Sequence, residues 1–198
     1  MIQRKIQCPE WALCVGGASC VWDDLAAWEV IYGREWGGIV IAANDIGCYL
    51  PYTIDAWVSM HPIKFEKWKA LRLANGFPVD GITTWCRTLR MGSQGLADNE
   101  MTPWGGGSSG MFTVQVAREL GCTRAVLCGI PMTMTPHFAE TQELFHKDWL
   151  AASGHWRAWI QCKDKMAGWV KSMSGRTQEL LGAPTIEWLQ EPIDAITT

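Results

Sequence analysis

The sequence predicts an α/β fold, namely a Rossmann-like three-layer arrangement with a mostly parallel sheet and a helical C-terminal region. Its short apolar runs are continuous rather than alternating, which is typical of strands buried on both faces. Segments with helical spacing separate these runs, and that alternation favours a parallel sheet with helices on both sides. The length of 198 residues suits one domain, so we expect a single domain spanning residues 1–198.

Each expected strand is an apolar run that stops at glycine or polar residues. The expected strands are 11–15, 39–43, 56–60, 82–87 and 125–130, with a last short strand at 185–189. The runs at 11–15, 39–43, 56–60 and 125–130 contain no charged residue, so we expect these strands at the centre of the sheet.

Helical spacing fills most of the intervals between the strands. The expected helices are 23–32, 63–73 and 109–120, followed by two helices within 139–174 that are broken near Gly154. A long glycine-containing loop is expected at 91–107. The helical region at about 132–182 is expected to form a lid or cover over the rest of the domain.

Charge and composition exclude several classes of protein. The 17 basic and 20 acidic residues are mixed along the chain and give a net charge of −3, so duplex nucleic acid is not expected as a partner. No uncharged run is apolar enough to span a bilayer. Arg4 and Lys5 precede an apolar stretch that is too short for an export signal, and we therefore expect a cytoplasmic protein.

The eight cysteines show no C-x-x-C spacing and no neighbouring histidine cluster. Cys14 and Cys128 lie inside apolar runs, where a free thiol is an ordinary small core side chain. We therefore expect reduced thiols and no metal site.

In parallel α/β sheets, ligands bind beyond the carboxyl ends of the strands. In this sequence that rule selects Gly16 to Ser19, Asn44 and Asp45, His61, and the residues from Pro131 onward. These segments are expected to share one rim of the sheet. The fold class therefore already indicates where a ligand site lies.

Two glycine-containing turns at this rim precede helices. The turn at Gly16 and Gly17 leads to a helix whose first turn carries Asp23 and Asp24, which repel an anion at that end. The segment 105–111 instead opens a helix that has no acid before Glu119, so its amides are suited to a phosphate. A plain serine N-cap after a flexible loop is the alternative reading of the second turn.

The segments LCVGGASC…WDDL and SSGMFTVQVARELGCTRAVLCGIPM resemble the family 42 bacterial sialyltransferases. They equally resemble the motility-accessory and pterin-pyrophosphokinase-like proteins of the same superfamily, and similar short reading frames occur in tailed phages. The resemblance covers roughly residues 11 to 135 and implies a Rossmann-like fold that binds a cytidine-nucleotide sugar.

Carried over residue by residue, the family pattern implies a defined set of nucleotide contacts. The matching positions are Gly17, Ser19, Asn44, Ser109 and Gly110, and their neighbours Gly16, Asp45 and Ser108 complete the expected nucleotide site. The family's asparagine before the first glycine is Gly16 here, its proline is Ala18, and its terminal acid is Pro131. Because the family's asparagine and acid are missing at these positions, the resemblance by itself fixes neither the type of sugar donor nor turnover in this chain.

Two histidines are candidate catalytic residues. His61 ends an expected strand at the rim, and His137 follows the fifth expected strand, where it is suited to deprotonate an acceptor hydroxyl. The alternatives are a structural hydrogen bond for His61 and a solvated loop position for His137. His146 and His155 are eight residues apart on expected helices and suggest no metal pair.

The thirteen tryptophans divide into two groups. Trp11, Trp57 and Trp85 lie in expected strands and are expected in the core. Those expected on the C-terminal helices are Trp149, Trp156, Trp159 and Trp169. Core packing is the default for the second group, and an aromatic face for a sugar ring or a homo-oligomer partner is the alternative.

Three functions fit these observations. The first is a nucleotide-sugar-dependent, sialyltransferase-like glycosyltransferase, or a degenerate relative that still binds the nucleotide. The second is a non-enzymatic phage accessory or morphogenesis protein that keeps the fold. The third is a pterin or nucleotide pyrophosphokinase, which needs metal-binding carboxylates at the rim, where Asp45 is the clear candidate.

Overall fold

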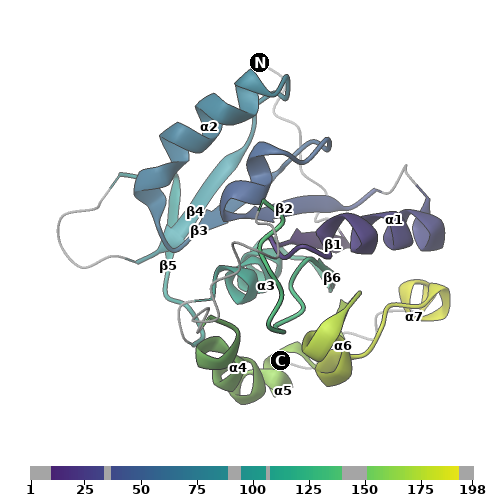
Figure 1. Ribbon diagram of the computed structural model, residues 1–198. Coiled ribbons are helices and arrows are strands. Elements are labelled where there is room, and N and C mark those ends of the chain that lie inside the picture. The colour runs from purple at the N-terminus through teal and green to yellow at the C-terminus, as the bar shows by residue number, and fades with distance from the viewer. Residues whose placement is uncertain (1–9, 34–36, 89–94, 106–107, 140–150, 192–198) are drawn as a thin grey trace.

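The computed structural model describes residues 10–33, 37–88, 95–105, 108–139 and 151–191 (Figure 1). Within these ranges the chain forms a seven-stranded sheet in the order β5-β4-β3-β2-β1-β6-β7, and every neighbouring pair is parallel. The strands are β1 (Trp11–Val15), β2 (Ile39–Ala43), β3 (Ala56–Ser59), β4 (Thr83–Arg87), β5 (Asn99–Met101), β6 (Arg124–Cys128) and β7 (Val170–Ser172). The predicted parallel sheet is confirmed, and β3, β2, β1 and β6 lie at its centre as expected.

Helices cover both faces of the sheet. The α-helices are α1 (Val21–Tyr32), α2 (Phe65–Ala74), α3 (Ser109–Glu119), α4 (Ala151–Gln161), α5 (Lys163–Met166), α6 (Gly175–Leu181) and α7 (Ile186–Gln190). Two 3₁₀ turns, η1 (Asn44–Cys48) and η2 (Pro62–Lys64), follow β2 and β3. In Figure 1, α2 lies above the sheet, whereas α3, α4 and α5 lie below it.

Two hydrophobic cores lie on the two faces because successive strand residues point in opposite directions. Ala12 and Cys14 of β1 join the core that contains α3 and Trp159. Leu13 and Val15 join the other core, which contains residues of α1, η1, α2 and α7. The continuous apolar runs in the sequence are therefore strands buried on both faces.

The C-terminal region differs from the expectation in two places. The segment 139–174, expected to be helical, contains β7, whose Val170 and Ser172 are buried while Lys171 is partly exposed. This alternating burial at the edge of the sheet is masked in the sequence by tryptophans and methionines at helical spacing. The strand expected at 185–189 is instead helix α7.

Helix α7 begins at a side-chain cap. The Thr185 hydroxyl accepts a hydrogen bond from the Trp188 amide at 3.1 Å, as an N-cap residue does.

The loop expected at 91–107 also differs from the structure, because it contains strand β5, in which Asn99 pairs with Trp85 of β4. Both errors concern elements of three to five residues, for which the pattern in the sequence is short.

Within the described part of the chain, the free thiols include those of Cys14, Cys20, Cys48, Cys86, Cys128 and Cys162. Burial raises the pKa of the Cys14 thiol to about 12, so it stays protonated in the core. None of the helices within the described ranges is long and apolar enough to cross a membrane.

The tryptophans of the strands and of the C-terminal helices are mostly packed inside. Trp11, Trp57, Trp159 and Trp169 are buried, whereas Trp85 and Trp156 are partly exposed. Trp149 lies outside the described residues. Core packing thus accounts for most of the tryptophans in both groups within the described residues.

Candidate functional site

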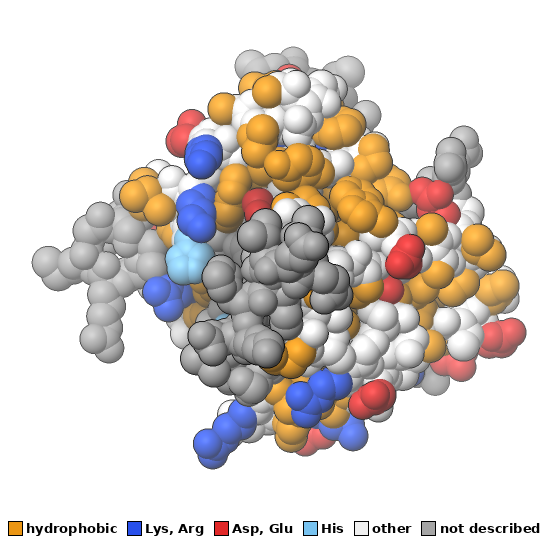
Figure 2. Space-filling view, in the orientation of Figure 1, with side chains coloured by type: hydrophobic (Ala, Val, Ile, Leu, Met, Phe, Trp, Pro, Cys, Tyr) orange, Lys and Arg blue, Asp and Glu red, His pale blue; other side chains and the backbone are white. Residues whose placement is uncertain are grey.

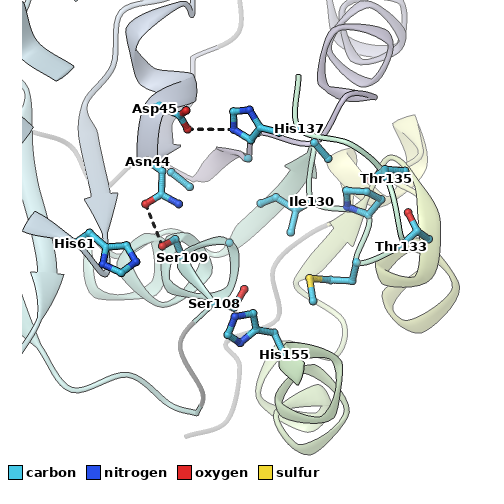
Figure 3. Close-up of a pocket in the computed structure, with 18 residues that line it drawn as sticks. Asn44, Asp45, His61, Ser108, Ser109, Ile130, Thr133, Thr135, His137 and His155 are labelled. Carbon is cyan, nitrogen blue, oxygen red and sulfur yellow. Dashed lines mark hydrogen bonds and ion pairs between the residues drawn. The ribbon is translucent and has the colours of Figure 1, made fainter. Parts of the chain in front are cut away.

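A pocket of about 310 Å³ opens beyond the carboxyl ends of the central strands (Figure 3). Its walls include Gly16 and Gly17 after β1, Asn44 and Asp45 after β2, His61 after β3 and Gly129 after β6. The sheet order changes direction at β1, which has β2 on one side and β6 on the other. The pocket therefore lies at the topological switch point of the sheet, where open α/β folds bind ligands.

The structure brings nearly all of the sequence-predicted site residues to this pocket. Those that line it are Gly16, Gly17, Asn44, Asp45, His61, Ser108, Ser109, Gly110 and His137. Ser19 is not among them: its side chain is exposed, and its amide donates to the Pro136 carbonyl at 2.9 Å. This hydrogen bond joins the turn after β1 to the segment after β6.

The turns after β1 and β6 are packed directly against each other. The Gly16 amide donates to the Cys128 carbonyl at 2.8 Å, and the Ala18 amide donates to the Gly129 carbonyl at 3.1 Å. A Cβ on Gly16 would lie 2.6 Å from the Gly129 oxygen, so only glycine allows this approach. Gly16 thus allows the turn after β6 to pack directly against the turn after β1.

Helix α3 points its N-terminus at the pocket. Ser108 is its N-cap, and the Ser108 hydroxyl accepts a long hydrogen bond from the Met111 amide at 3.4 Å. The serine N-cap that was the alternative reading is therefore present, one residue before the predicted phosphate contacts. Helix geometry leaves the amides of Ser109 and Gly110 without intrahelical acceptors, and the first turn holds no acidic residue.

Asn44 is held in the left-handed backbone region, with φ of 58°. Its side-chain oxygen accepts hydrogen bonds from the hydroxyls of Ser59 at 2.8 Å and Ser109 at 3.2 Å. Its backbone carbonyl accepts from the Trp57 indole at 2.6 Å. These contacts occupy the side-chain oxygen, and the Asn44 amide nitrogen lies beside it on the pocket side (Figure 3), where it is placed to donate to a ligand.

Asp45 and His137 face each other across the upper part of the pocket in Figure 3. The Nε2 atom of His137 lies 3.1 Å from the Asp45 Oδ1 atom, and the His137 side chain is only 19% exposed. Burial raises the pKa of the Asp45 carboxyl, but the hydrogen bond and charge of His137, together with Lys64, bring it below its usual value.

The tautomer of His137 follows from its second contact. Its Nδ1 atom accepts a hydrogen bond of 3.4 Å from the Ala139 amide, so the proton is assigned to Nε2, which donates to Asp45. An isolated bridge between Ala18 and His137 joins this segment to the β1 turn. His137 is thus oriented by a carboxylate and by two stretches of backbone.

His155 is a pocket residue to which the sequence analysis gave no role. It lies on α4, lines the pocket, and approaches Ser108 from the side opposite Asn44 (Figure 3). The spacing of His155 from the other histidines in the sequence does not indicate a place in the pocket, because His155 reaches the pocket only through the packing of α4 below α3. His61 is exposed at the edge of the pocket, and His146 lies outside the described residues.

Part of the region expected to cover the site contributes to its wall. Met132, Thr133, Thr135, His137 and His155 all fall within the expected lid at 132–182 and line the pocket. Residues 140–150 of that region lie outside the described part of the chain. Within the described ranges no group of three or more His, Cys, Asp or Glu side chains is arranged to hold a metal ion.

An aromatic cluster lies next to His137, which is part of the pocket wall. Phe138 makes edge-to-face contacts with Trp22 and Tyr49, at centroid distances of 6.3 and 5.3 Å, and it also contacts the His137 ring. Trp22 and Tyr49 stay 41% and 39% exposed. Figure 2 shows hydrophobic side chains gathered on this face around the positions of η1 and α1 in Figure 1.

Known proteins provide one informative comparison. No protein-family model and no curated protein matches the sequence. Among solved structures, the sialyltransferase CstII from Campylobacter jejuni, described in complex with the substrate analogue CMP-3FNeuAc, matches with a TM-score of 0.52 and 13% identity. The match covers 90% of this chain and 87% of that one. The chain therefore has an α/β, Rossmann-like fold of the kind found in that glycosyltransferase.

Proposed function

We propose that the pocket binds a nucleotide sugar of the cytidine-monophosphate type and that the protein is a sialyltransferase-like glycosyltransferase. One observation carries this proposal: the N-terminus of α3, the Asn44 amide and the Asp45–His137 pair all converge on a single pocket at the switch point of the sheet. The fold shared with a sialyltransferase described with a CMP-sugar analogue supports the choice of ligand.

The phosphate of the nucleotide is assigned to the N-terminus of α3. The amides of Ser109 and Gly110 are the donors there, and the helix dipole favours an anion at this end. Among the described residues that line the pocket, the ionisable side chains are Asp45, His61, His137 and His155, with no lysine or arginine. This charge balance suits one bridging phosphate better than a diphosphate.

The proposed transfer joins an acceptor hydroxyl to the sugar. The hydroxyl oxygen bonds to the anomeric carbon, the bond from that carbon to the phosphate oxygen breaks, and the nucleotide leaves with the electron pair. The hydroxyl proton passes to a base. We assign this role to His137: its Nδ1 accepts a long hydrogen bond of 3.4 Å from the Ala139 amide, which the acceptor hydroxyl would have to replace, and the charge of Asp45 at Nε2 stabilises the imidazolium that forms.

A ligand panel read by thermal shift and calorimetry tests the proposal. CMP at a hundred times its Kd stabilises the native protein by about 2.7 kcal/mol, which raises Tm by roughly 5–10 °C for a chain of this length. CMP and a CMP-linked sugar are expected to bind, while UDP and inorganic phosphate at equal concentration shift Tm less.

The same panel separates the alternatives. Binding of a pterin or of ATP with Mg²⁺, and not of CMP, supports a pyrophosphokinase. The absence of a shift with every ligand at millimolar concentration contradicts the proposal and favours a non-enzymatic accessory protein that keeps the fold.

A further inference from the structure

Asp24 is a buried carboxylate next to, but not part of, the pocket wall. It lies in the first turn of α1 and is 6% exposed, whereas its neighbour Asp23 is exposed. The Asp24 Oδ2 atom accepts a hydrogen bond from the Gly129 amide at 2.7 Å and another from the Ser174 hydroxyl at 2.8 Å. These partners lie 105 and 150 positions away in the sequence.

The turn that Asp24 contacts forms one wall of the pocket. Gly129, Ile130 and Pro131 line the pocket, and Gly129 has a φ of +65°, which a residue with a side chain rarely adopts. Ile130 lies against Gly110 so closely that a Cβ on Gly110 would be 2.8 Å from the Ile130 Cγ2 atom. The position of this turn therefore sets the position of the α3 N-terminus relative to β6.

Three neighbours hold the turn in place. The Gly129 carbonyl accepts from the Ala18 amide at 3.1 Å. On the other side, the Thr177 hydroxyl of α6 donates to the Ile130 carbonyl at 2.6 Å. Asp24 supplies the third contact at the Gly129 amide, and through Ser174 it also reaches the start of α6.

A carboxylate at this position carries an energetic cost. Burial raises the pKa of Asp24, and the bonds from Gly129 and Ser174 oppose that rise without cancelling it. Hydrogen bonds to a charged acceptor are stronger and more directional than those between neutral groups. A charged acceptor therefore fixes the Gly129 amide more firmly than a neutral side chain would.

We propose that Asp24 is a positioning residue of the pocket, holding the Gly129–Pro131 turn so that Ile130 packs on Gly110 and the α3 N-terminus faces the ligand. Asp24 itself touches no ligand. This role of Asp24 does not depend on which ligand binds in the pocket.

The matched pair Asp24→Asn and Asp23→Asn tests this role, because both variants remove one negative charge from the same helix turn. In ¹H–¹⁵N spectra, the Gly129 amide proton is expected to move upfield in Asp24→Asn and to stay in place in Asp23→Asn. The contact between the Ile130 methyl groups and Gly110, seen as a nuclear Overhauser effect, weakens only in Asp24→Asn. Neither readout needs a ligand.

Calorimetry with CMP then measures the consequence for binding. At a temperature where every variant is folded, Asp24→Asn is expected to weaken CMP binding by about fivefold to tenfold, while Asp23→Asn stays within about twofold. Asp24→Ala, which also loses the acceptor shape, weakens binding further. If Asp24→Ala does not fold, Asp24→Asn alone decides, since its amide oxygen can still accept from Gly129.

The outcomes for the two proposals are distinct. A parent protein that does not bind CMP contradicts the proposed function, and the Gly129 and Ile130 signals still decide the role of Asp24. An Asp24→Asn protein with unchanged Gly129 and Ile130 signals overturns the positioning role. So does one whose signals move while CMP affinity stays that of the parent.

Discussion

The Nε2 atom of His137 and the Oδ1 atom of Asp45 lie 3.1 Å apart, although 92 positions separate the two residues in the sequence. Asp45 comes directly after β2, and His137 follows β6, on opposite sides of β1 in the sheet. The pair exists because the carboxyl ends of parallel strands meet at one edge. It joins a carboxylate to an imidazole in the wall of the same pocket that the α3 N-terminus lines, as the proposed role of His137 requires.

Replacing His137 is expected to remove turnover and to spare nucleotide binding. A general base contributes about 10² to 10⁴ in rate, so His137→Gln should lower kcat by a factor in that range. The CMP dissociation constant should change by no more than about threefold, because the base acts on the acceptor hydroxyl rather than on the phosphate. Initial rates with a CMP-linked sugar, together with calorimetry, give both quantities.

His155→Gln is the matched control, because His155 lines the same pocket from α4. A loss of turnover in His155→Gln with full activity in His137→Gln would move the base to α4 and contradict the assignment.

The variant Asp45→Asn tests whether Asp45 only orients the His137 ring or also stabilises its charged form. It keeps the shape at the Asp45 position, and the expected loss of turnover is smaller than that of His137→Gln.

Because the phosphate is assigned to the N-terminus of α3, a charge introduced at Ser109 should lower CMP affinity much more than the same charge introduced at Ser19. Ser109→Asp places a negative charge at the first residue of α3, where it repels the phosphate and competes for the free amides. A helix end contributes up to about 2 kcal/mol to a partly buried anion, so CMP affinity should fall by at least tenfold. Ser19→Asp adds the same charge at an exposed position outside the pocket lining, and affinity should change by less than about threefold. Strong binding by Ser109→Asp combined with weak binding by Ser19→Asp would mean that the phosphate lies at the β1 turn.

The central sheet could be predicted because its signal is local and repeated. The runs at 11–15 and 125–130 are buried along their whole length, and the run at 39–43 is buried from Val40 onward, so their hydrophobicity is unbroken in the sequence. Once the strands are parallel, their carboxyl ends define a rim, and Asn44, Asp45 and His61 follow directly from their places in the chain. Placing these residues at the rim needed only the ends of the strands in the sequence and their parallel direction.

The missed features depend on packing between distant segments. His155 reaches the pocket only through the placement of α4 beneath α3, and nothing near it in the sequence records that contact. In the sequence Asp24, like Asp23, indicates only an acid in the first turn of a helix that repels an anion at that end. The helix actually begins two residues earlier, at Val21, and Asp24 turns inward to Gly129, a partner that no local pattern names.

Gly110 is expected to be intolerant of a methyl group. A Cβ there would lie 2.8 Å from the Ile130 Cγ2 atom, inside ordinary contact distance. Overpacking of this kind costs about 1–3 kcal/mol, so Gly110→Ala should lower stability by that amount in urea unfolding. Gly37→Ala is the control, because a Cβ on Gly37 meets nothing within 4 Å. Equal stability of the two variants would show that Ile130 can move away, and that it does not fix the start of α3.

The burial of Asp24 predicts a specific dependence of stability on pH. Burial raises the pKa of the Asp24 carboxyl in the folded protein, whereas an unfolded aspartate has a pKa of about 3.9. The folded state therefore holds the Asp24 proton more tightly than the unfolded state does. The stabilisation linked to that proton is present at low pH and is lost as the pH rises through the folded pKa.

The variant Asp24→Asn cannot titrate at this position. The Tm of the parent minus that of Asp24→Asn should therefore become larger when the pH is lowered from 7 to 4.5. The corresponding difference for Asp23→Asn should change less, because the Asp23 side chain is exposed. A shift in the opposite direction for Asp24→Asn would mean that the hydrogen bonds from Gly129 and Ser174 outweigh burial and hold the carboxylate ionised.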